Sequence, residues 1–167
     1  MKIINNLPSM GGTFLNPKTI LSDEWKILKD EDDVILVLEE PSSAAMAFKV
    51  WPKAKFNVKK IVYAGGTLDR GDATPYAEKS IYNDPEAMES LLNTGITVVF
   101  CTIEEAKKRN MSVKELANDY ANNPSKYETI ECGVHIEIQR ASKAYGKMVA
   151  DYMADHKFEK KNALIFK

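Results

Sequence analysis

The chain has 167 residues, of which 44% are hydrophobic and 28% charged, and its formal net charge is −1. This length fits one domain whose core needs neither disulfides nor a metal for stability. The near-neutral charge excludes nucleic-acid or anionic-membrane binding that depends on bulk charge. We therefore expect no nucleic-acid partner and no membrane partner.

Cysteine usage and hydropathy point to a cytoplasmic protein. Cys101 and Cys132 are the only cysteines, too few for a disulfide framework, and both are interpreted as reduced thiols. No apolar run reaches the ~20 residues that span a bilayer. The first twelve residues, MKIINNLPSMGG, lack the long apolar core of a signal peptide.

Strand signals recur through the first two thirds of the chain. A short first strand is predicted within residues 1–8, where Pro8 ends it. Three later runs are apolar and β-branched without polar alternation, which is typical of strands covered on both faces. These runs are residues 34–40, 58–66 and 96–101.

Helix signals separate these strands. Pro41 and Pro52 bracket one helix, and a second starts with Asp84 as N-cap and Pro85 at the first helical position, and stops at Gly95. Strands that alternate with helices predict a parallel sheet with right-handed crossovers.

The last third of the chain is less regular. Two helical pieces are predicted within residues 102–127, the second capped by Ser112 with Glu115 three residues later. Residues 133–139 alternate as a half-buried strand does, and residues 162–166 form a closing strand. Residues 141–153 fit a helical period, although Gly146 weakens that interpretation.

A long polar connection joins the strand at 58–66 to the helix at Pro85. It lies at the carboxyl end of a strand, where α/β sheets bind ligands, and long loops in compact domains are more often functional than not. Gly65 and Gly66 at its start allow sharp turns and close approach of the backbone to a ligand.

The residues around this loop resemble the nucleoside hydrolases, the inosine-uridine-type N-ribohydrolases. That family has a Gly-Gly pair after a strand, a Gly-Asn-x-Thr-Pro-x-Ala-Glu-Phe-Asn loop, an Asp-Pro-Glu-Ala helix start and a Gly-Ile-Pro strand entry. The residues that match in order and spacing are Gly65, Gly66, Gly71, Thr74, Pro75, Ala77, Glu78, Tyr82, Asp84, Pro85, Glu86, Ala87 and Gly95.

The resemblance implies an α/β fold with a small, mostly parallel sheet, flanking helices and a C-terminal antiparallel β-hairpin. At the C-terminus Gly146, Asp151 and Asn162 match the family's terminal hairpin, so the resemblance favours a hairpin over a helix at 141–153. We expect residues 1–167 to form one nucleoside-hydrolase-like domain that lacks the family's N-terminal metal-binding half.

The family's chemistry is hydrolysis of the N-glycosidic bond, with a Ca²⁺ ion that holds the ribose diol and a water. Its metal ligands come from a D-x-D-x-x-x-D-D run after the first strand, and this sequence has no such run. The acidic residues 29–33 precede a strand and are interpreted as a solvated turn, and residues 39–44 replace the family's Gly-Pro-Leu-Thr-Asn. We expect no metal, no cofactor and no catalytic residue.

The loop retains part of the family's sugar-binding set. Glu78 keeps its identity, and its family role is a hydrogen bond to the sugar, whereas Asp72 and Ser80 stand where the family has asparagines. The alternative for Glu78 is a loop carboxylate that caps backbone N–H groups. The candidate ligand-binding residues are Gly65, Gly66, Asp72, Thr74, Glu78, Ser80 and Tyr82.

Three functions remain open at this point. The first is a non-catalytic module that senses or sequesters a nucleoside, nucleotide or ribosyl-containing signal molecule. The second is an active N-ribohydrolase, and the third is a scaffold without a ligand. In each case we expect a homo-oligomer, because a shortened family member exposes surface that was once covered.

Overall fold

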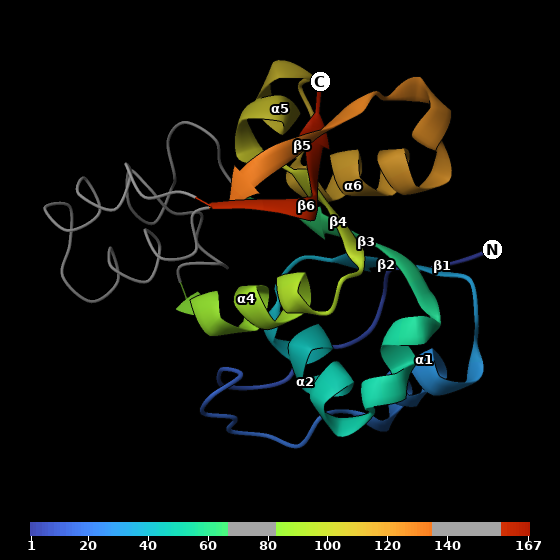
Figure 1. The fold of residues 1–167 in the computed structure, drawn as a ribbon, viewed down its shortest axis with the longest axis vertical. Coiled ribbons are helices and arrows are strands. Elements are labelled where there is room, and N and C mark those ends of the chain that lie inside the picture. Colours follow the sequence, from blue (N-terminus) through green and yellow to red (C-terminus); the bar gives the residue numbers. More distant parts are fainter. Residues whose placement is uncertain (67–82, 135–157) are drawn as a thin grey trace, which may run out of the picture.

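The structure is a computed structural model, and it describes residues 1–66, 83–134 and 158–167. Six strands of these residues form one sheet (Figure 1). Their order is β1 (Lys2–Ile4), β2 (Val34–Leu38), β3 (Val58–Ala64), β4 (Thr97–Cys101), β6 (Phe158–Phe166) and β5 (Thr129–Val134). The first five in this order are parallel, and β5 is antiparallel to β6, which confirms the predicted mostly parallel sheet with a C-terminal antiparallel pair.

Helices cover both faces of the sheet. Figure 1 shows α2, α4 and α1 below the sheet and α5 and α6 above it. The lower elements are the 3-10 turn η1 (Asp23–Lys26), α1 (Ile27–Asp30), α2 (Ser42–Val50), the 3-10 turn η2 (Pro52–Phe56) and α4 (Pro85–Asn93). The upper ones are α5 (Ile103–Lys108), α6 (Val113–Asn122) and the 3-10 turn η3 (Pro124–Lys126).

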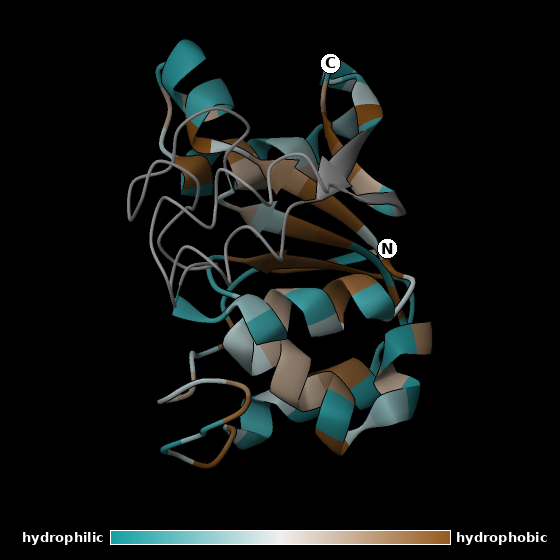
Figure 2. Cartoon of the chain, turned by 60° about the vertical axis from the view of Figure 1, so that its left-hand side comes forward, coloured by the Kyte–Doolittle hydropathy of each residue, from teal (hydrophilic) through white to brown (hydrophobic). Residues whose placement is uncertain are grey.

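The strand pleat divides the apolar residues between two cores. In β2, Leu36 packs with the helices below the sheet and Val37 with those above it, and every residue of this strand is buried. This explains why β2, β3 and β4 read as continuous apolar runs in the sequence. Figure 2 shows the mostly hydrophobic strands between two layers of helices that carry both hydrophobic and hydrophilic residues. Among the described residues, no helix combines the length and the apolar character needed to span a bilayer.

The predicted helix caps are present. Asp84 accepts a hydrogen bond from the Ala87 N–H at the start of α4, and Ser112 and Glu115 form a capping box at the start of α6. Gly95 follows the end of α4 with φ of 83°, a conformation that glycine adopts without strain.

Several predicted boundaries were wrong. The first strand ends at Ile4, before Pro8. Of the strand predicted at 133–139, residues 133 and 134 belong to β5, which begins at Thr129, and residues 135–139 lie outside the described residues. The closing strand β6 begins at Phe158 instead of residue 162, because the antiparallel partner β5 extends its pairing. Residues 141–153, where the resemblance favours a hairpin, lie outside the described residues.

Candidate functional site

The candidate site lies where the parallel strands end. The carboxyl ends of β2, β3 and β4 meet at one edge of the sheet, here called the carboxyl edge. Glu40, Gly65 and Thr102 follow these strands directly or after one residue. Of the predicted ligand-binding residues, the structure describes Gly65 and Gly66. Asp72, Thr74, Glu78, Ser80 and Tyr82 lie outside the described residues.

Gly65 and Gly66 are held between the end of β4 and the start of α5. The Gly65 N–H donates to the Cys101 carbonyl at 3.1 Å, and the Gly66 carbonyl accepts from the Ile103 N–H at 3.1 Å. Gly66 has φ of 90°, and a β-carbon there would lie 3.1 Å from Cδ1 of Phe100. The backbone conformation and the contact with Phe100 are therefore sufficient reasons for glycine at position 66.

Asp84 links three segments at the carboxyl edge. Its side chain is buried, with 2% of the residue exposed. Oδ1 accepts from the Ala87 N–H at 3.2 Å, and Oδ2 accepts from the Phe14 N–H at 2.8 Å and from the Ser42 hydroxyl. The predicted cap of α4 thus also fixes the start of α2 and the N-terminal segment.

Polar side chains at the start of α2 also form hydrogen bonds with backbone N–H groups. The Glu40 carboxylate accepts from the N–H groups of Ser42 at 2.8 Å and Ser43 at 3.4 Å. The buried Ser43 hydroxyl accepts from the Met10 N–H at 2.8 Å. Sequence reasoning missed the contact between Ser43 and Met10, because these residues are 33 positions apart in the chain.

The described residues at this edge do not fit the metal that the resemblance implies. Hard cations bind clustered carboxylate oxygens, and the oxygens of Glu40 and Asp84 already accept N–H and O–H donors. Within residues 1–66, 83–134 and 158–167, no three His, Cys, Asp or Glu side chains form a group that holds a metal ion.

Asn162, which matches the family's last strand, bonds to backbone carbonyls of the protein. Its amide donates to the Leu92 carbonyl at 2.8 Å and to the Ile96 carbonyl at 3.0 Å. These bonds hold β6 against the connection between α4 and β4. The Cys101 thiol is buried, and burial raises its pKa to about 12, so Cys101 is an unreactive structural thiol.

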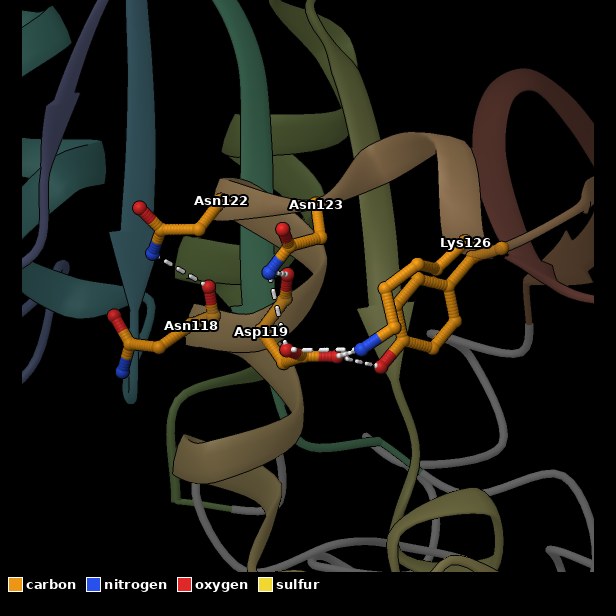
Figure 3. Close-up of polar contacts among 6 residues, drawn as sticks. Asn118, Asp119, Asn122, Asn123 and Lys126 are labelled. Atoms are coloured by element: carbon orange, nitrogen blue, oxygen red, sulfur yellow. Dashed lines mark hydrogen bonds and ion pairs between the residues drawn. The ribbon is translucent and has the colours of Figure 1, made fainter.

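A second polar cluster lies at the end of α6, and the sequence did not indicate it (Figure 3). The Asp119 carboxylate accepts from the Tyr127 hydroxyl, from Lys126 Nζ at 3.1 Å and from Asn123 Nδ2 at 3.2 Å. The hydrogen bond from Tyr127, followed by that from Lys126, lowers the pKa of Asp119. Burial and the bond to Asp119 raise the pKa of Tyr127 to about 12. This cluster joins α6 to η3 and to Tyr127, the residue after η3.

Comparison with known protein families identifies the class. The model of the family described as "Inosine-uridine preferring nucleoside hydrolase" matches residues 25–165, so the chain belongs to this family. This is the family that the sequence was found to resemble, so the resemblance is confirmed.

Individual relatives match part of their length. The chain is 30% identical over 76 residues to the non-specific ribonucleoside hydrolase RihC of Klebsiella pneumoniae, which covers 46% of this chain and 25% of that protein. It is 31% identical over 90 residues to the pyrimidine-specific ribonucleoside hydrolase RihA of Escherichia coli, covering 53% of this chain and 29% of that protein. The matched region therefore spans less than a third of these relatives.

Solved structures share the fold. A plant nucleoside hydrolase, PpNRh1, matches 91% of this chain and 56% of its own with a TM-score of 0.61 at 15% identity. The purine-preferring ribonucleoside hydrolase of Gardnerella vaginalis matches 90% of this chain and 62% of its own with a TM-score of 0.59 at 16% identity. This likeness confirms the nucleoside-hydrolase-like α/β fold.

Proposed function

We propose that the chain binds a nucleoside, nucleotide or other ribosyl-containing molecule at the carboxyl edge and does not hydrolyse it. One observation carries the proposal: the carboxylates of Glu40 and Asp84 at this edge are engaged by backbone N–H groups and a serine hydroxyl. These donors occupy part of the lone-pair capacity of each carboxylate and fix its orientation, which disfavours metal binding and proton abstraction by it.

The connection between β3 and α4 supports binding rather than a bare scaffold. It leaves the sheet at the carboxyl end of β3, the position at which α/β sheets bind ligands. Gly66 at its start and Asp84 at its end are both fixed to neighbouring elements. In this proposal Glu78 receives hydrogen bonds from the ribose hydroxyls.

A thermal-shift titration tests binding, with inosine, uridine, AMP and ADP-ribose as separate probes. A ligand at 100 times its dissociation constant adds about 2.7 kcal/mol of stability. We expect at least one ribosyl probe to raise the melting temperature and Glu78→Ala to abolish the rise. The matched control is Glu128→Ala, which removes an exposed carboxylate and leaves the response unchanged. If no probe shifts the melting temperature, the binding proposal is wrong.

The names of the relatives supply the second candidate, an active ribonucleoside hydrolase. Release of free base from uridine or inosine measures it directly. Base release by the wild type that disappears in Glu78→Ala would establish hydrolysis in place of binding alone. A Glu78→Ala chain that fails to fold, while Glu128→Ala folds, would instead assign Glu78 a structural role.

A further inference from the structure

A pocket of about 420 Å³ lies at the edge of the sheet opposite the candidate site. Helix α2 starts beside the carboxyl end of β2 and ends before the amino end of β3, so its last residue and η2 lie at the amino edge. Val50, Trp51 and Lys53 line the pocket from these elements, and Lys29 lines it from α1. We call it the lysine-rimmed pocket.

The pocket is apolar inside and exposed around its rim. Val50 keeps 50% of its surface exposed, and Phe56, in the same 3-10 turn as Lys53, keeps 79%. Trp51 is partly buried against the lower core. Exposed apolar side chains grouped around a concave surface are typical of interaction sites on soluble proteins.

The charged side chains that line the pocket are both lysines, Lys29 and Lys53. Between Glu40 and Asp69 the sequence contains five lysines and no acidic residue. Lys29 Nζ lies 5.9 Å from the Trp51 ring centroid and Lys55 Nζ lies 5.4 Å from that of Phe56. Among the described residues, Lys29, Lys53 and Lys55 have no carboxylate within ion-pair distance.

Acidic residues 30–33 follow Lys29 in the chain, and two of them are paired with other cations. Asp33 pairs with Lys59 at 2.9 Å and with the N-terminal amine at 3.3 Å, and Glu31 pairs with Lys2 at 3.3 Å. Lys29 and Lys53 line the pocket themselves and have no such pair among the described residues, so their charge is available to a partner. An apolar hollow with a cationic rim complements a peptide that carries an apolar side chain between carboxylates.

We propose that the lysine-rimmed pocket docks an acidic peptide segment of another protein through one apolar anchor side chain. The concave shape favours a peptide over a membrane, which contacts convex apolar surfaces. Its small apolar floor favours an inserted side chain over a nucleic-acid strand, which tracks along a basic groove. This proposal is independent of the ligand proposed for the carboxyl edge.

Selection from a random peptide library on the immobilised full chain tests this proposal. We expect enriched peptides that combine Asp or Glu with a central aromatic or aliphatic residue. The double variant Lys29→Glu/Lys53→Glu should weaken the best peptide by about tenfold or more, and added salt should weaken it for the wild type. Val50→Ser should also weaken binding, because it removes apolar surface from the pocket.

The matched control is Lys107→Glu/Lys108→Glu, which makes the same charge change on α5 across the sheet and should leave the affinity unchanged. The proposal is overturned if no peptide is enriched, or if enriched peptides are neutral or basic. It is also overturned if the pocket variant binds as well as the wild type. Binding of single-stranded DNA or phosphatidylserine vesicles that the pocket variant loses would assign the pocket to those partners, and loss of a dimer in that variant would assign it to a second copy.

Discussion

Two aspartates of this fold each accept three hydrogen-bond donors, yet they have different structural roles. Asp84 is buried and binds Phe14 and Ser42, which lie 70 and 42 residues away in the chain. Asp119 is partly exposed and binds side chains that lie four to eight residues away. The comparison teaches that hydrogen bonds to a carboxylate stabilise the tertiary structure when the carboxylate is buried and its donors are distant in the chain. When the carboxylate is exposed and its donors are local, the bonds stabilise only the end of a helix.

The largest predicted effect is that of Asp84→Ala. The change removes the cap of α4 and leaves the donors of Phe14 and Ser42 without their acceptor, so we expect a loss of about 3 kcal/mol in the free energy of unfolding. Urea denaturation measures it. Asp84→Asn keeps one carbonyl oxygen and should lose less. A loss below about 1 kcal/mol for Asp84→Ala would mean that Asp84 stabilises the protein only as the cap of α4, and that its bonds to Phe14 and Ser42 add nothing.

Gly66→Ala should have the next largest effect, a loss of about 2 kcal/mol in the free energy of unfolding. Alanine there has an unfavourable φ of 90° and its β-carbon presses on Phe100. Gly95 is the control, since its φ of 83° is similar but its β-carbon would meet nothing within 4 Å. Gly95→Ala should therefore lose only the backbone term, about 1 kcal/mol. Equal losses of stability in Gly66→Ala and Gly95→Ala would show that the contact with Phe100 does not affect stability.

Asn162→Ala should cost about 1 to 2 kcal/mol, because it leaves the Leu92 and Ile96 carbonyls without their donor. Chemical denaturation measures the loss. The exposed Asn118→Ala, which removes an amide bonded to Asn5 and to the Lys114 carbonyl, is the control and should cost less. Loss of nucleoside binding in Asn162→Ala without loss of stability would contradict its structural role.

The smallest effect is expected at Asp119. Tyr127→Phe should cost less than about 1 kcal/mol near neutral pH, because exposed polar pairs are screened. The lowered pKa of Asp119 contributes stability above its unfolded pKa of about 4 and loses it as pH falls through the folded value. The raised pKa of Tyr127 contributes stability below about pH 10 and loses it as pH rises through about 12.

Melting temperature as a function of pH tests these signs. Tyr127→Phe should melt with a flatter dependence than the wild type, both below about pH 4 and above about pH 10. Superimposable curves for the two proteins would mean that the hydrogen bond between Tyr127 and Asp119 does not form in solution.

The sequence predicted those parts of the fold that local signals determine. Apolar runs gave β2, β3 and β4, and Asp84, Pro85 and Ser112 marked helix starts, because caps act within one turn of a helix. The start of β5 was missed, since it depends on the antiparallel partner that extends the pairing.

The candidate site was less predictable. The links from Asp84 to Phe14 and from Ser43 to Met10 join residues that only the folded chain brings together. Local pattern carries no signal for such contacts. The roles of Asp72, Thr74, Glu78, Ser80 and Tyr82 stay predictions from the resemblance, because these residues lie outside the described part of the chain.

The central claim, binding without hydrolysis, is tested most directly by proton NMR of inosine and uridine incubated with the wild-type chain. Saturation transfer from the protein to the nucleoside reports binding, and signals of free hypoxanthine or uracil in the same spectra report hydrolysis. The account predicts saturation transfer to the ribose protons, absent in Glu78→Ala, with no free base accumulating. Accumulation of free base, or the absence of saturation transfer from the wild type, would contradict it.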